Sequence, residues 1–113
     1  MSRDWRVFVE DIIDAIEKIE RYTKNQSLVD FLTNEEKQDA VIRNLEVVGE
    51  AAGKVPEQIQ EQAHTIEWRK IIGLRNILIH EYFGVSIPMV WDIVQNKLSQ
   101  LKITCLELRS GEK

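Results

Sequence analysis

Apolar residues recur at intervals of three and four positions along most of the chain, which is the period of an amphipathic α-helix with one face in a core. Between Trp5 and Tyr22 they lie at Phe8, Val9, Ile12, Ile13, Ile16 and Ile19. A second stripe consists of Val41, Leu45, Val48, Ala52 and Val55, and a third of Val90, Val94, Leu98, Leu101, Cys105 and Leu108. The pattern therefore predicts three long amphipathic helices.

Polar residues and glycine mark the ends of the second helix. Thr33 and Glu36 have the spacing of a capping box, in which each side chain accepts a hydrogen bond from a backbone N–H, so a helix is predicted to start there. It should run to about Gly53, where glycine stops it. Residues 23–32, just before it, predict a polar turn followed by a short apolar anchor.

Two further boundaries follow from proline and serine. Pro56 predicts the first turn of a short helix that extends to His64, with Ile59 and Ala63 on its inner face. Ser86 predicts the N-cap of the last helix, the one that carries the third apolar stripe.

A fourth helix-like run covers Trp68–Phe83, and no stretch alternates apolar and polar residues long enough to make a convincing strand. At 113 residues the chain is large enough for one hydrophobic core and too small for two. We therefore predict a single domain over residues 1–113, an all-α antiparallel four-helix bundle with one short extra helix.

Composition narrows the class of protein. The chain has 43% hydrophobic and 30% charged residues, no apolar run long enough to cross a bilayer, and no apolar signal-peptide core near its start, so we expect a cytoplasmic protein. Its single cysteine, Cys105, forbids an intrachain disulfide and reads as a small core residue. No Cys or His pair has metal-ligand spacing, so no metal or other cofactor is expected.

Small residues gather near the end of the second helix, at Gly49, Ala51, Ala52 and Gly53. An interior glycine lowers the stability of a helix by about 1 kcal/mol relative to alanine, so glycine within this patch needs an explanation. Either a neighbouring helix, the one bearing the fourth run, packs closely against it, or the helix frays toward its C-cap. Glu50, inside the patch, is either solvated or orients a group of that neighbour.

The run Trp68–Phe83 carries Arg75, Asn76, His80 and Tyr82 among apolar residues. A buried polar group without a partner costs about 1–3 kcal/mol, so four of them in one apolar helix need an explanation. Taken singly, each has an ordinary structural one, such as a surface cation or a rim tyrosine. Arg75 and His80 together are the groups that cleavage of an RNA phosphodiester uses when no metal takes part.

Each of these side chains suits a step of that chemistry. Histidine, with a pKa of about 6.5, can take the proton of a 2′-hydroxyl or give one to the leaving oxygen. A guanidinium offers bidentate hydrogen bonds to phosphate oxygens where negative charge develops. Asn76 would hold the phosphate or the imidazole. Although the net charge of −4 argues against a broad grip on nucleic acid, Arg69 and Lys70 would extend the site into a small basic cleft.

Helical geometry sets a condition on this site. At about 100° per residue, Arg75 and His80 point roughly 140° apart on an ideal helix, whereas Asn76 shares a face with His80, and Arg75 with Tyr82. One straight helix therefore cannot aim Arg75 and His80 at one atom. Either the helix is distorted near 79–82, or two copies of the chain complete one site.

At these residues the chain resembles the HEPN superfamily, and within it the small HepT toxins. Arg75, His80 and Tyr82 reproduce the R-x4-H-x-Y motif of that branch, and Asn76 is the polar residue usual after the arginine. The stretches 44–52, 68–69 and 83–85 resemble the family as well, so the likeness covers most of the chain.

The resemblance implies a dimeric HEPN bundle with two motifs at a shared cleft, and a metal-independent ribonuclease with Arg75 and His80 as catalytic residues and a 2′,3′-cyclic phosphate product. It also implies a toxin–antitoxin pair of the type VII kind. The partner would be a minimal nucleotidyltransferase antitoxin that transfers AMP to Tyr82, adding bulk and negative charge where RNA phosphate must sit.

Two alternatives stay open. The chain would instead be a non-catalytic module whose cleft holds a nucleotide or an RNA end, or which packs as an accessory bundle against a nucleotidyltransferase; its acidic balance and lack of a basic arm favour this reading. A purely structural four-helix dimer would explain the apolar stripes but not the polar residues of Trp68–Phe83.

Overall fold

The computed structural model describes residues 4–80 and 85–111. Within these ranges the chain is helical with no strand, as predicted from the period of its apolar residues. The helices are α1 (Trp5–Thr23), α2 (Leu28–Leu32), α3 (Glu35–Ala52), α4 (Glu57–Gln62), α5 (Trp68–His80), α6 (Ile87–Asn96) and α7 (Leu98–Ser110).

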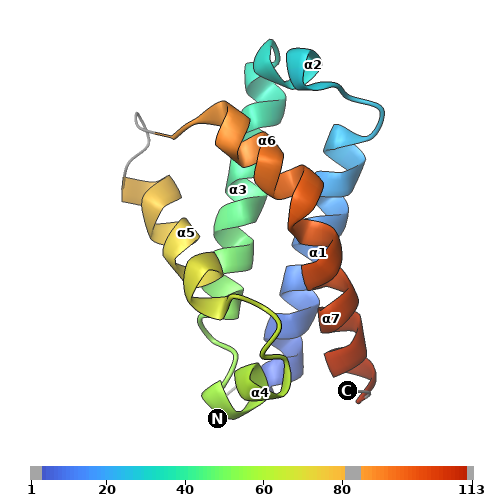
Figure 1. Ribbon diagram of the computed structural model, residues 1–113, viewed down its shortest axis with the longest axis vertical. Coiled ribbons are helices and arrows are strands. Elements are labelled where there is room, and N and C mark those ends of the chain that lie inside the picture. The colour runs from blue at the N-terminus through green and yellow to red at the C-terminus, as the bar shows by residue number, and fades with distance from the viewer. Residues whose placement is uncertain (1–3, 81–84, 112–113) are drawn as a thin grey trace.

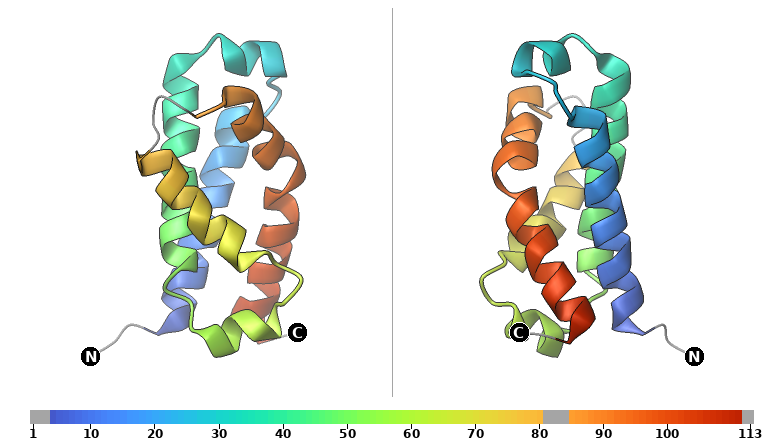
Figure 2. Two further views of the ribbon diagram at one scale, coloured as in Figure 1. Left: turned by 60° about the vertical axis from the view of Figure 1, so that its left-hand side comes forward. Right: turned by 90° about the vertical axis from the view of Figure 1, so that its right-hand side faces the viewer.

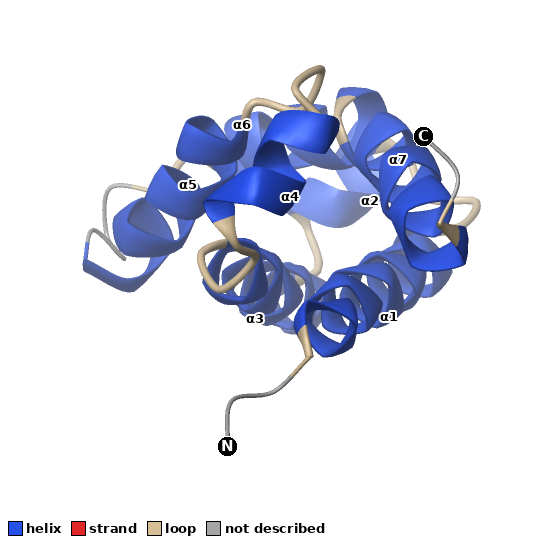
Figure 3. Ribbon diagram, turned by 90° about the horizontal axis from the view of Figure 1, so that it is seen from below, coloured by secondary structure: helices blue, strands red, loops and turns tan. Residues whose placement is uncertain are grey.

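The long helices form an antiparallel bundle, which confirms the predicted all-α fold. α1 and α3 run in opposite directions side by side, α7 packs on α1, and α5 packs on α3 (Figure 1). The two short helices close the ends of the bundle: α2 bridges α1 and α3 at one end, and α4 crosses the other end, as the view along the bundle shows (Figure 3). The described part of the chain thus has two short helices, one more than predicted. None of the described helices is both long and apolar enough to cross a membrane.

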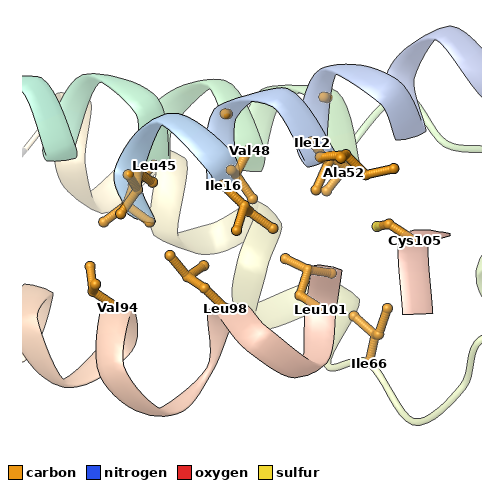
Figure 4. Close-up of a cluster of buried hydrophobic side chains, with 14 of the residues drawn as sticks. Ile12, Ile16, Leu45, Val48, Ala52, Ile66, Val94, Leu98, Leu101 and Cys105 are labelled. Atoms are coloured by element: carbon orange, nitrogen blue, oxygen red, sulfur yellow. The ribbon is translucent and has the colours of Figure 1, made fainter. Parts of the chain in front are cut away.

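The core lies between α1, α3 and the last two helices. Ile12 and Ile16 of α1 face Leu45 and Val48 of α3, and the third apolar stripe packs against them from the opposite side (Figure 4). All six residues of that stripe are buried. Cys105 is among them and is fully buried, which confirms that it is a core residue.

The capping box predicted at Thr33 and Glu36 is wrong. Asn34 is the N-cap of α3 and its side chain accepts a hydrogen bond from the Lys37 backbone N–H, 3.0 Å away. Thr33 instead ends α2, where its hydroxyl donates to the carbonyl oxygen of Val29. Asparagine is as good an N-cap residue as threonine, so Asn34 can cap α3 in place of Thr33.

The capping box of this chain lies one helix earlier, in the segment predicted as an apolar anchor. Ser27 and Asp30 exchange backbone-to-side-chain hydrogen bonds of 2.9 and 3.1 Å and start α2. The hydrogen bond from the Ser27 backbone N–H, together with one from the Ser27 side chain, holds the pKa of the Asp30 carboxyl below its usual value. Of the apolar residues in α2, Phe31 alone is buried, and its ring contacts Trp91 of α6.

The last predicted helix is present but interrupted. Ser86 is its N-cap, as predicted, and accepts from the Met89 backbone N–H. At Lys97 the φ angle widens to −118°, and this residue divides the segment into α6 and α7. The change of direction lets α6 lean across the bundle toward α2 while α7 stays on α1 (Figure 1).

The short helix predicted after Pro56 is α4, with Pro56 at its N-cap and Ala63 buried just beyond its end. His64 is exposed, as predicted.

Candidate functional site

The predicted site residues that the structure describes lie on α5, which crosses α3 obliquely on one side of the bundle (Figure 2). Two buried residues hold it there. Trp68 begins the helix, and its Nε1–H donates to the carbonyl oxygen of Ala63 over 3.1 Å. Near the other end, Leu78 is fully buried. The helix is therefore anchored on both sides of Arg75.

α3 and α5 approach each other closely at Gly49. A Cβ added to Gly49 would lie 2.5 Å from the Cβ of Arg75 and 2.9 Å from the carbonyl oxygen of Ile71. This contact confirms the first reading of the small-residue patch, in which the helix carrying the motif packs closely against it. Glu50 is exposed and lies 3.8 Å from Lys54, so it belongs to the solvated surface.

Arg75 is half-buried, with its stem against α3 and its head at the surface. Its Nη1 donates to Asn76 Oδ1 over 3.1 Å. Its Nε is buried, and no acceptor among the described residues bonds to it. Asn76 itself is exposed. The hydrogen bond between Asn76 and Arg75 brings the two side chains together and holds one side of the guanidinium.

His80 is the last residue of α5, and Tyr82 lies outside the described residues, as do the other residues of 81–84. The α-helix is continuous from Trp68 to His80, so positions 75 and 80 keep the angular separation of about 140° that an ideal helix gives. No distortion within 68–80 brings the two positions to one side.

Arg69 and Lys70 lie near the start of α5, about 8–9 Å along the helix axis from Arg75 at 1.5 Å per residue. Both are exposed. Lys70 is engaged in an ion pair of 2.8 Å with Glu67, whose hydrogen bond raises the pKa of Lys70 while that of Glu67 is lowered. Glu67 is not among the residues predicted for the site, although the i, i+3 spacing of Glu67 and Lys70 signals the pair.

A groove of about 420 Å³ separates α5 from the last two helices. Ile71 and Leu74 of α5 form one wall, and Ile93 and Leu101 form the other. Among the described site residues only Lys70 reaches it, so this groove is distinct from the surface at Arg75 and Asn76. Within residues 4–80 and 85–111, no cluster of three or more His, Cys, Asp or Glu side chains has the arrangement of a metal site.

Comparison with known proteins supports the resemblance read from the motif. Residues 12–108 match the family model described as Ribonuclease HepT-like. A protein of Thermococcus cleftensis named "Probable ribonuclease HepT" is 39% identical over 90% of this chain and 93% of its own length. One of Caldanaerobacter subterraneus named "Putative RNase" is 32% identical over 96% of both chains.

A further relative is longer. The protein of Methanocaldococcus jannaschii named "Gamma-glutamylcyclotransferase and putative RNase" is 37% identical over 96% of this chain, which spans 49% of that relative. No solved structure matches the chain significantly.

Proposed function

Since the chain belongs to the HepT-like ribonuclease family, we propose that it is a metal-independent ribonuclease and the toxin of a toxin–antitoxin pair. The observation that carries the proposal is the pairing of Arg75 with Asn76 at the surface of α5. Asn76 holds Nη1 over 3.1 Å, so the guanidinium is oriented before any substrate arrives. Such preorganisation is what stabilises charge in a transition state.

In the proposed reaction, His80 takes the proton of a ribose 2′-hydroxyl and the 2′-oxygen attacks the adjacent phosphorus. The new 2′-O–P bond forms as the P–O5′ bond breaks. A proton then passes to the leaving 5′-oxygen, which leaves a 2′,3′-cyclic phosphate on one fragment and a 5′-hydroxyl on the other. Arg75 stabilises the negative charge on the phosphate oxygens.

The site is proposed to form between two copies of the chain. Positions 75 and 80 point about 140° apart on a continuous helix, so one copy cannot direct both side chains at one phosphate. A homodimer about a twofold axis would place the histidine of one copy near the arginine of the other. Arg69 and Lys70 would contact phosphates further along the bound RNA.

Single substitutions test the catalytic assignment. Arg75→Ala and His80→Ala should each slow cleavage of an RNA substrate by about 100-fold or more and abolish growth arrest on expression. Arg109→Ala is the matched control, because Arg109 is an exposed arginine on α7 that pairs with Glu10. Cleavage that persists in both site variants would refute the assignment, and cleavage unaffected by EDTA supports metal independence.

We further propose that a cognate nucleotidyltransferase silences the toxin by transferring AMP from ATP to Tyr82. The tyrosine oxygen attacks the α-phosphorus of ATP, its proton is lost, and pyrophosphate leaves. The chain has one other tyrosine, Tyr22 on α1, which serves as an internal control. Mass spectrometry should find the adduct on Tyr82 and none after Tyr82→Phe; no adduct, or one on Tyr22, would refute the proposal.

The second candidate is a non-catalytic module that binds a nucleotide or an RNA end, or accompanies a nucleotidyltransferase. Two observations favour it: the net charge of −4, and the engagement of Lys70 by Glu67, which reduces the positive charge near the motif. Such a module would bind its partner normally and cleave no RNA. The same cleavage assay therefore separates the two candidates.

A further inference from the structure

We propose that Gly49 of α3 is a positioning residue for Arg75: by having no side chain, it lets α5 approach closely enough to set the direction of the guanidinium. The inference deepens the proposed function, because it rests on Arg75 as the group that binds phosphate. It starts from a contact outside the R-x4-H-x-Y motif, between two helices far apart in the sequence.

The contact leaves no space for any side chain at position 49. A Cβ there would lie 2.5 Å from the Arg75 Cβ, 2.9 Å from the Ile71 carbonyl oxygen and 3.2 Å from the Arg75 backbone nitrogen. Ordinary carbon–carbon contact is about 3.5–4.0 Å, so even alanine would push the helices roughly 1 Å apart. Two of these three neighbours are backbone atoms, which cannot rotate away as a flexible side chain can.

The Arg75 side chain is fixed at both ends. Its Cβ lies against Gly49, its Nε is buried, and its Nη1 is held by Asn76 at the surface. A displacement of α5 at Gly49 therefore moves the guanidinium itself. A misplacement of about 1 Å in a reacting group can cost on the order of 100-fold in rate.

Gly53, the C-cap residue of α3, provides a matched control. A Cβ added there would meet its nearest neighbour, the Glu50 carbonyl oxygen, at 3.5 Å, which is ordinary contact. Gly49→Ala and Gly53→Ala thus make the same chemical change one turn apart, and the C-cap backbone at Gly53, with a φ of −66°, accepts alanine without strain. Only the first should displace α5.

The experiment measures the rate of RNA cleavage and the affinity for a 2′-O-methyl RNA, which cannot be cleaved, with folding checked by circular dichroism. Gly49→Ala should cleave about 100-fold more slowly than Gly53→Ala and bind the 2′-O-methyl RNA more weakly. In an Arg75→Ala background, Gly49→Ala should cause no further loss of affinity, because its effect passes through the arginine.

A folded Gly49→Ala protein that cleaves within about threefold of Gly53→Ala would overturn the inference. So would a loss of affinity that adds to that of Arg75→Ala, because this would show an effect independent of the arginine. If the wild-type chain cleaves no RNA, the proposed ribonuclease function fails, while the affinities still test the coupling of Gly49 to Arg75.

A measurement on the unsubstituted protein covers the case in which Gly49→Ala does not fold. With 15N-labelled arginine, the Nε–H of Arg75 should exchange with water more slowly than that of Arg21, which is exposed on α1. Slow exchange supports a fixed guanidinium, and exchange as fast as that of Arg21 overturns the inference.

Discussion

Arg75 serves the core and the surface with different parts of one side chain. Its stem lies in the contact between α3 and α5, while the charged head reaches Asn76. Lys and Arg side chains commonly bury their methylene groups and keep the charged head in water. Burying the methylene groups therefore costs much less free energy than burying the charge would. The cost anticipated for polar groups in a buried helix is therefore avoided at Asn76, which is exposed, and at Arg75 it is confined to Nε, which is buried without an acceptor among the described residues.

Cys105 gives a residue-scale prediction. Burial raises the pKa of its thiol to about 12 from a usual value of 9.0. The folded state thus holds this proton more tightly than the unfolded state does. Its contribution to the free energy of unfolding should be constant below pH 9 and should decline as the pH rises from there toward 12.

Urea unfolding of the wild type and of Cys105→Ala, at pH 8 and again at pH 10.5, isolates this effect, because the variant keeps every other titrating group. The wild type should lose more stability between the two pH values than the variant. Native protein should also resist iodoacetamide at pH 8 and react once unfolded. Equal pH dependence in both proteins would contradict the burial of the thiol.

At the scale of single residues the sequence supplies candidate site residues but does not determine their contacts. The motif spacing named Arg75 and Asn76, but their hydrogen bond depends on side-chain rotamers that the spacing does not determine. The small residues near Gly49 signalled a close approach, yet which residue of α5 would meet Gly49 depends on how the two helices cross. The ion pair of Glu67 with Lys70 was readable from spacing and was overlooked.

Among the elements, apolar periodicity predicted every long helix, whereas the ends depended on local competition. Thr33 and Asn34 are adjacent and both can cap, and the structure assigns α3 to Asn34. The break at Lys97 could not be predicted from the third apolar stripe, because all six residues of the stripe are buried on either side of the break. The change of direction between α6 and α7 is accompanied by a contact of α6 with α2.

The cap assignment predicts unequal effects at two neighbouring positions. Asn34→Ala removes the acceptor for the Lys37 backbone N–H and should lower the free energy of unfolding by about 1 kcal/mol. Thr33→Ala removes an exposed hydroxyl that bonds within α2 and should cost less. Urea unfolding of both variants decides the matter: if Thr33→Ala is the more destabilising, Asn34 is not the residue that caps α3.

At the scale of the whole molecule, the fold of a single copy does not explain the face of α5 that is turned away from α3. By helical register, Arg69, Gly73, Asn76 and position 80 fall within a sector of about 60°. No described atom outside the local helix backbone lies within 4 Å of where a Gly73 Cβ would be, so this face is open in a single copy. An interior glycine there costs about 1 kcal/mol, with no packing reason inside the described part of the chain.

A second copy approaching this face would bring position 80 of one chain toward Asn76 of the other, which holds the Arg75 guanidinium, and this predicts complementation between inactive variants. Arg75→Ala and His80→Ala, each inactive alone, should regain activity when unfolded together and refolded as a mixture. Random pairing makes half the dimers mixed, and each mixed dimer has one intact site of two, so about a quarter of the wild-type rate should return.

The control is a double variant, Arg75→Ala with His80→Ala, refolded with wild type in equal amounts. Its mixed dimers hold one wild-type chain, so every composite site lacks one of the two groups. The mixture should then show only the activity of its wild-type dimers, about a quarter of that of pure wild type. If the two single variants stay inactive together, and the wild type mixed with the double variant keeps half its activity, each chain carries a whole site and the proposed site between two copies is wrong.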